Sequence, residues 1–306
     1  MASATTLSAA DRLVDGRAGA KSAGFFRRAM RAFRRDKVAM VALVVVVLVA
    51  LFALMAPLIS RWTGFDPYEN HLQYKLSKPG ENGFILGSDA NGRDILTRLA
   101  YGGRISMTVA FLGTIAELTI GLTIGLVAGY SGGLVDSFLM RLVDLLLSIP
   151  SLPLLILVTT LYQPSWVGLA FILAIVSWPS DSRLIRGEAM SIKKREYVDA
   201  ARVVGVGPIG IVLRYVLPNV LPTMLVLASL TIPSLIIAET SLSFLGVGVQ
   251  VPTASWGNML DDAYRFYRTN WTNVFIPGFI VFAVSLCLYL VGDGLRDAFD
   301  PRQTDR

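Results

Sequence analysis

Six apolar stretches of about twenty residues each dominate this sequence, and each is long enough to cross the roughly 30 Å hydrocarbon core of a membrane as a helix. Backbone groups find no water in lipid, so a spanning segment must be a helix or part of a closed barrel. The apolar runs are continuous rather than alternating, which favours helices. Only 16% of the residues are charged, against roughly 25% in soluble domains. The sequence therefore predicts an all-α integral membrane protein with six transmembrane helices, at about 38–58, 105–129, 134–161, 166–186, 221–246 and 274–292.

The distribution of basic residues predicts the orientation of these helices. With the N-terminus in the cytoplasm, 20 of the 28 Lys and Arg residues fall in cytoplasmic segments, as the inside-positive bias requires. We expect both termini inside, and we read the first apolar stretch as an uncleaved anchor because it is too long and too far from Met1 for a signal peptide. The predicted division is a basic tail (1–37), an anchor (38–58), an external loop (59–103), a core domain (104–292) and a cytoplasmic tail (293–306).

Aromatic residues outside and between the helices add two expectations. Phe25, Phe26, Met30 and Phe33 have the spacing of a short amphipathic helix on the inner leaflet, and a partly disordered tail is an equal alternative. Four tryptophans fall near the predicted outer boundary, where such rings settle at the headgroup level. They are Trp62, Trp166, Trp256 and Trp271.

Several chemistries are excluded by what the sequence lacks. Cys287 is the single cysteine and His71 the single histidine, so we expect no catalytic residue, no disulfide and no metal site within the chain. No GxxxxGK[ST] loop occurs, and a Walker-type phosphate cradle is therefore impossible. The formal charge of +6 is explained by the inside-positive bias, and we expect no nucleic-acid partner.

The long cytoplasmic loop between the fourth and fifth predicted spans, 187–222, is the most informative segment. Residues 193–204 are predicted to form one amphipathic helix, Gly205 and Gly207 a turn, and Pro208 the first residue of a second helix. A plain connection between two helices is usually shorter. We therefore expect a protruding elbow, in which the small residues Ala200 and Ala201 indicate a docking partner.

This elbow resembles the EAA signature of binding-protein-dependent ABC importer permeases. The matching residues are Asp199, Ala200 and Ala201, then Gly205, then Leu217 and Pro218. Asp199 stands where Glu is usual, and Tyr215 where Ile is usual; charge sign and apolar bulk are kept. Three further stretches, 86–106, 239–248 and 252–260, are similar to motifs of the dipeptide, oligopeptide and nickel branch. The basic tail and extra first span resemble its C-type subunit.

The resemblance implies a type I ABC importer permease in a bacterial or archaeal cell membrane. Its expected partners are a second, B-type permease subunit, two ATPase subunits that hold ATP and Mg, an extracytoplasmic substrate-binding protein and the lipid bilayer. No cofactor is expected on this chain. The coupling to the ATPase is implied for Tyr197, Asp199, Ala200, Ala201, Gly205, Leu217 and Pro218. For Asp199, simple capping or solubilisation of the helix is the alternative. Substrate identity, peptide or a small solute such as nickel, is left open.

Ionisable residues inside lipid usually face a cavity or a helix interface. Glu117 lies mid-span among glycines, and Glu239 resembles the motif glutamate of the family. We consider two roles for them, a translocation path or gate and a packed interhelical hydrogen bond. The candidate path or gate set is Glu117, Glu239, Ser241, Ser243 and Phe244.

Two helix-packing interpretations complete the membrane segments. Gly121, Gly125 and Gly129 form GxxxG steps, which indicate close packing either within this subunit or against a second permease subunit. Arg141 and Asp144 are three residues apart, and we expect them to pair across one turn.

Two other functions compete with an importer permease. In an ion-coupled secondary transporter, Glu117 and Glu239 would carry protons, but inverted repeats and matching interrupted helices are not evident and the elbow would have no role. A membrane scaffold would leave the intramembrane carboxylates without purpose.

Overall fold

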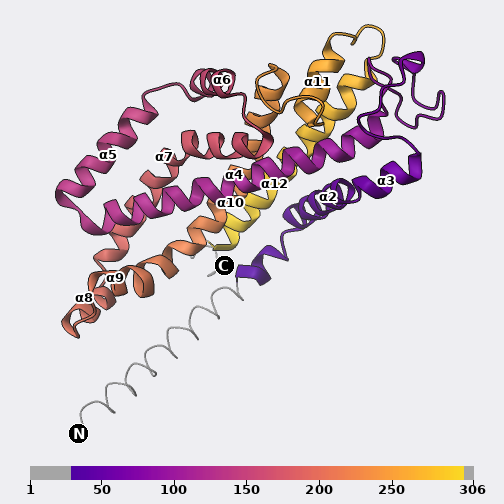
Figure 1. Cartoon of the computed structure of the whole chain (residues 1–306). Coiled ribbons are helices and arrows are strands. Elements are labelled where there is room, and N and C mark those ends of the chain that lie inside the picture. The colour runs from indigo at the N-terminus through magenta and orange to yellow at the C-terminus, as the bar shows by residue number, and fades with distance from the viewer. Residues whose placement is uncertain (1–28, 300–306) are drawn as a thin grey trace, which may run out of the picture.

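The computed structural model describes residues 29–299, and every regular element in that range is helical (Figure 1). Five helices are long and apolar enough to span a membrane. They are α2 (Lys37–Leu54), α4 (Ile95–Ser131), α7 (Trp166–Lys193), the continuous run α9 to α10 (Pro208–Phe244) and α12 (Thr272–Phe299). A sixth span results if α5 (Gly133–Leu147) and α6 (Ser151–Tyr162) are counted together. The predicted all-helical membrane architecture is confirmed.

The third predicted span, 134–161, is not one straight helix. It is divided into α5 and α6, whose axes differ by 81°. Pro150 at the break has extended backbone, with φ −59° and ψ 123°. Proline donates no backbone N–H and disfavours helical geometry in the preceding residue, here Ile149. The predicted span is therefore broken at Pro150, and it counts as one crossing only when α5 and α6 are taken together.

Three helix boundaries also differ from those expected. α4 begins at Ile95, about ten residues before the predicted span, because Asp94 caps it: its carboxylate accepts the Thr97 amide at 2.7 Å. α7 continues to Lys193, so the first elbow helix is α8 (Glu196–Val203) and not 193–204. The second elbow helix, α9 (Pro208–Ile211), runs through the π-helical turn η2 (Val212–Val216) directly into α10 (Leu217–Phe244).

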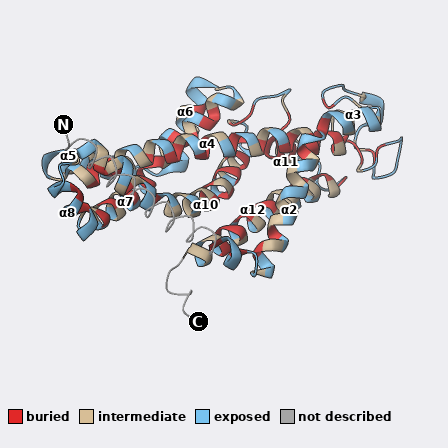
Figure 2. Cartoon of the chain, turned by 90° about the horizontal axis from the view of Figure 1, so that it is seen from below, coloured by how far each residue is buried: buried red, intermediate tan, exposed pale blue. Residues whose placement is uncertain are grey.

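Close packing of α4 on α7 forms the centre of the bundle. A Cβ at Gly125 would lie 2.7 Å from the Ser182 carbonyl oxygen, and one at Gly129 would lie 2.7 Å from that of Arg186. The glycine steps therefore pack within this subunit, the first of the two alternatives considered. In Figure 2 buried residues gather where α4, α7 and α10 meet. In the most apolar stretch of α4 and of α7, 50% of the residues are buried, against 17% in α2. α2 therefore lies at the edge of the bundle.

The residues of the expected N-terminal amphipathic helix lie partly inside and partly outside the described range. Phe33 is buried and belongs to an apolar cluster with Ala39, Ala42 and Val291, so it packs on α12 and not on a leaflet. Met30 is half exposed. Phe25 and Phe26 lie outside the described residues.

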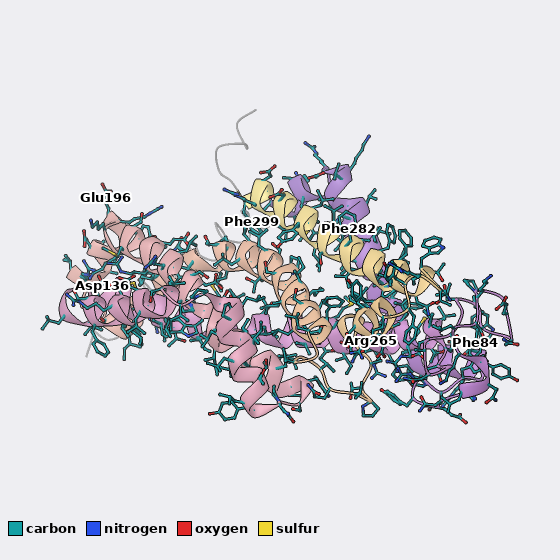
Figure 3. The ribbon with its side chains drawn as sticks, turned by 90° about the horizontal axis from the view of Figure 1, so that it is seen from above. Phe84, Asp136, Glu196, Arg265, Phe282 and Phe299 are labelled. Atoms are coloured by element: carbon teal, nitrogen blue, oxygen red, sulfur yellow. The ribbon has the colours of Figure 1, made fainter. Side chains whose placement is uncertain are left out.

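The two ends of the bundle differ in character. The elbow and the start of α5 lie at one end, as the labels of Glu196 and Asp136 show in Figure 3, and Phe84 and Arg265 mark the other. At that other end α3 (Ala56–Thr63), the loop before α4 and α11 (Trp256–Tyr264) form a polar cap. Arg93 joins this cap by binding Asp89 at 2.7 Å and Asp262 at 2.8 Å.

Trp256 is part of this cap and does not reach a headgroup region. It is fully buried, and its indole N–H donates to the Leu99 carbonyl at 3.0 Å. The expectation of a boundary tryptophan is wrong here, because the 252–260 segment folds back between α4 and α10. Trp62 and Trp271 are exposed, and their place at a membrane boundary stays a prediction.

Candidate functional site

The elbow owes its shape to a sharp turn between α8 and α9. Gly205 has φ +89°, its amide donates to the Arg202 carbonyl at 3.0 Å, and the Val206 amide donates to the Ala201 carbonyl at 3.0 Å. This bonding satisfies the last carbonyls of α8, and only glycine adopts such a backbone without strain. Gly207 has φ −67° and is the N-cap residue of α9, which begins at Pro208 as predicted.

One side of the elbow is anchored in the bundle. Val198 and Ala201 are buried, and Val198 belongs to an apolar cluster with Ile185, Ile192 and Ile211. The ring of Tyr197 stacks on that of Tyr215, with centroids 6.5 Å apart. These contacts tie α8 to the ends of α7 and α10.

The opposite side of the elbow is apolar and uncovered in this chain. Val203, Val204 and Ile209 are 88%, 75% and 76% exposed. The sequence analysis did not single out these three residues, although apolar side chains at a turn between two helix ends were a visible signal. A contiguous exposed apolar tip is the usual mark of an interaction site.

The predicted coupling residues separate into different positions. Ala201 faces the bundle, Ala200 and Asp199 face outward, and Leu217 and Pro218 lie at the base of α10. The Asp199 carboxylate accepts from Arg202 at 2.8 Å within the same helix. Both side chains are exposed, so this pair adds little stability and leaves Asp199 available to a partner.

A cleft of about 340 Å³ lies beside the elbow, at the C-terminal end of α4. Lys193 on its wall donates to the Tyr130 carbonyl, and its ammonium lies 5.2 Å from the centre of the Tyr130 ring. The cleft is lined by Gly129, Gly132, Met190, Lys193, Lys194, Asp199 and Arg202. A partner that binds the tip therefore meets basic side chains next to it.

Glu117 is buried between α4 and α7, where it meets a residue that the sequence analysis missed. Its carboxyl group lies next to that of Asp181, which is also buried. Gly121 makes the contact possible, since a Cβ there would lie 3.1 Å from the Asp181 Cβ. No sequence spacing relates 117 to 181, which only helix packing brings together.

Glu239 is fully buried near the C-terminal end of α10. Ser243 donates to its carboxylate at 2.7 Å and accepts the Val249 amide at 2.9 Å. The hydroxyls of Ser106, Thr240 and Ser255 also face this carboxylate. The network holds the 246–255 loop against α4 and α10.

The other candidate path residues lie apart from Glu239. The Ser241 hydroxyl donates to the Ile237 carbonyl of its own helix at 2.7 Å. Phe244 is partly exposed and packs edge-on against Tyr264 at 5.9 Å. The candidate set therefore occupies three places, of which Glu117 is one, Glu239 with Ser243 the second, and the partly exposed Ser241 and Phe244 the third.

The expected pair of Arg141 with Asp144 is not formed. Asp144 instead accepts from Arg183 of α7, and Arg186 of α7 binds Asp136. Helix packing brings a better-placed guanidinium across from α7, so α5 is held to α7 by two ion pairs.

Comparison with known proteins bears on both the bundle and the elbow. A family described as binding-protein-dependent transport system inner membrane component matches residues 121–305, and one described as the N-terminal TM domain of oligopeptide transport permease C matches 24–79. The chain is 38% identical to the dipeptide transport system permease protein DppC of Haemophilus influenzae, covering 81% of this chain and 85% of that protein. It is also 38% identical to the oligopeptide transport system permease protein OppC of Escherichia coli K12, covering 90% of each.

A solved structure shares the fold. The match is to a chain of the MetNI methionine ABC transporter in inward facing conformations, with a TM-score of 0.50 and 21% identity, over 65% of this chain and 95% of that one. At this identity the likeness concerns architecture alone. It supports a type I importer arrangement of the core helices.

Proposed function

The chain belongs to the family of binding-protein-dependent transport system inner membrane components, and we propose that it forms half of the path by which di- or oligopeptides enter the cell. It is a multi-pass permease subunit of an ABC importer. Relatives named for dipeptide and oligopeptide transport, matched over most of their length, favour peptides over nickel as the substrate. The ion-coupled transporter finds no support in these relatives.

The other subunits follow from this proposal. A B-type permease subunit completes the path, two ATPase subunits bind ATP and Mg, and an extracytoplasmic binding protein delivers the peptide. Both termini lie in the cytoplasm. Residues 1–37 and 293–306 then form inner tails, 38–58 an anchor, 59–103 an outer loop and 104–292 the core, with the coupling segment at 187–222.

The elbow is the proposed contact with the ATPase. The observation that carries this is its two-sided build: Val198 anchors it in the bundle while Val203 and Ile209 project outward. An apolar tip buried in a groove contributes binding free energy, and the anchored side transmits the resulting movement to α7 and α10. Glu239 and Ser243 are proposed to hold the outer gate, whereas Glu117 serves the α4–α7 contact.

Retention of the ATPase in detergent tests this role. Val203→Asp buries a charge in the proposed interface and should release the ATPase subunits during purification of the complex. Leu72→Asp is the matched control, because Leu72 is an exposed apolar residue at the opposite end. Full retention in the Val203 variant would exclude the tip as the contact.

A second experiment addresses coupling. Exchanging Asp199 and Gly205 together should abolish ATP-driven peptide uptake while the chain still accumulates in the membrane. Normal uptake by that double variant would contradict the coupling role of the elbow.

A further inference from the structure

One flank of α5 carries polar side chains in a regular series. Ser137, Arg141, Asp144 and Ser148 recur at steps of four, three and four residues, which places them on one face of a helix. All four are exposed in the described chain. We name them the polar stripe. The rest of the exposed surface of α5 is apolar, as Leu134, Phe138 and Leu145 show.

α7 extends this polar surface. Ser180 and Arg183 are exposed, and Arg183 meets the stripe by donating to Asp144. The side chains of this pair are 51% and 60% exposed, whereas those of the neighbouring pair, Arg186 and Asp136, are 29% and 13% exposed. The less exposed pair, Arg186 with Asp136, fixes α5 to α7. The more exposed pair, Arg183 with Asp144, lies open on the surface of this chain and is called the displayed pair.

Asp144 and Arg183 lie in two of the candidate membrane spans, the bent pair α5–α6 and α7. Arg183 is 17 residues beyond the start of α7 at Trp166, or about 26 Å along the helix. Asp144 is 11 residues beyond the start of α5 at Gly133, or about 17 Å from the elbow end. Both positions fall within the length that crosses a roughly 30 Å core.

Exposed charges at such depth do not face lipid, because charged side chains in spanning helices turn to a bundle interior or a water-filled cavity. The serine hydroxyls are weaker evidence for a water-facing surface, because Ser137 and Ser148 already donate to carbonyls of their own helix. Arg141, Asp144 and Arg183 carry the argument. Their flank must face water or protein in the membrane.

We propose that the polar stripe, with Ser180 and Arg183, lines the water-filled peptide path on the elbow side and holds the two charged ends of the peptide in transit. This rests on the peptide import proposed above. A peptide presents a carboxylate, which suits the guanidinium groups of Arg141 and Arg183, and an ammonium group, which suits Asp144. An exposed ion pair is weak in water, so a passing peptide exchanges readily with the Asp144–Arg183 bond.

Thiol labelling of the assembled transporter in nanodiscs tests the water-facing claim. Cys287 is the single cysteine, so Cys287→Ser gives a clean background. Single cysteines replace Ser137, Ser148 or Ser180 in the stripe surface, and Phe138 or Leu145 as controls on the apolar face. A charged thiol reagent should label the first group at least about tenfold faster, because the thiolate forms in water and not in hydrocarbon.

Excess trialanine with the binding protein should slow the labelling of the stripe cysteines. Labelling as slow as the controls would place the stripe in lipid and overturn the proposal. Labelling of the isolated chain but not of the transporter, with or without trialanine, would assign the stripe to the second permease subunit and also overturn it. Labelling that trialanine leaves unchanged would reject the peptide contact.

Peptide uptake by the unmodified transporter, measured in parallel, tests the substrate. Absence of uptake would reject peptide import, while faster labelling of the stripe cysteines than of the controls would still report a water-filled path.

A charge exchange separates peptide contact from a structural role. Asp144→Arg combined with Arg183→Asp keeps an ion pair between α5 and α7 but reverses its polarity. We expect normal amounts of transporter and a KM for trialanine raised about tenfold, as for one lost charge-assisted contact. Unchanged KM would mean that the pair only joins the helices. The same exchange of Asp136 and Arg186 is the control and should leave KM unaltered.

Discussion

Replacement of Gly205 by alanine isolates the conformational requirement of the elbow turn. A Cβ at this position meets nothing within 4 Å, so no steric clash with neighbouring residues arises. The cost comes from the backbone, because φ is +89°. A residue with a Cβ loses about 1–2 kcal/mol in left-handed geometry, which lowers the equilibrium constant between the native turn and its open forms roughly 5- to 30-fold.

Gly207 offers a matched control two residues away. It also has open space around its Cβ position, but its φ is −67° and its ψ is 163°, a backbone that alanine adopts freely. Gly207→Ala should cost at most about 0.5 kcal/mol, as a slightly poorer N-cap. Gly205→Asn should fall between the two alanine variants, since asparagine visits left-handed geometry more easily than other residues.

Two measurements on the reconstituted transporter check this reasoning. Hydrogen exchange of the 197–206 amides should accelerate for Gly205→Ala in proportion to the lost turn population and stay near the unmodified rate for Gly207→Ala. ATP-driven uptake should follow the same order. Equal exchange rates and equal uptake for the two alanine variants would refute the claim that the left-handed turn shapes the elbow.

The remaining predictions concern packing and buried hydrogen bonds, each measured by thermal unfolding of the detergent-solubilised protein. Gly125→Ala should destabilise the chain by about 1–3 kcal/mol through overpacking, whereas Gly187→Ala, which enters open space in the same helix pair, should be neutral or gain helix propensity; equal effects would contradict the close α4–α7 contact. Trp256→Phe should cost about 1 kcal/mol of stability through its lost indole hydrogen bond, and an unchanged stability would contradict that hydrogen bond. Ser243→Ala should cost about 1–3 kcal/mol by removing one donor from the buried Glu239 and the acceptor of the Val249 amide, and a neutral result would argue against this network.

Features that depend on a few neighbouring residues were predictable from the sequence. The length of an apolar run decides whether it crosses a membrane, so five of the six spans were recovered, with ends that shifted where caps intervened. Asp94 illustrates such a shift, because a single N-cap extends α4 well beyond its apolar part. The elbow turn was also predictable, since Gly205 and Pro208 signal their backbone conformations without reference to any neighbour.

The sequence by itself thus determined the helical class and most positions of the membrane segments, the turn of the elbow and, through its motifs, the family. The tertiary structure alone decided which side chains meet across helices. It placed Asp181 next to Glu117, paired Asp144 with Arg183 and buried Trp256 in the polar cap. The physical reason is that hydrophobic length, capping and turn geometry act over a few residues, whereas interhelical partners depend on the rotation and depth of two packed helices, which no spacing along one chain encodes.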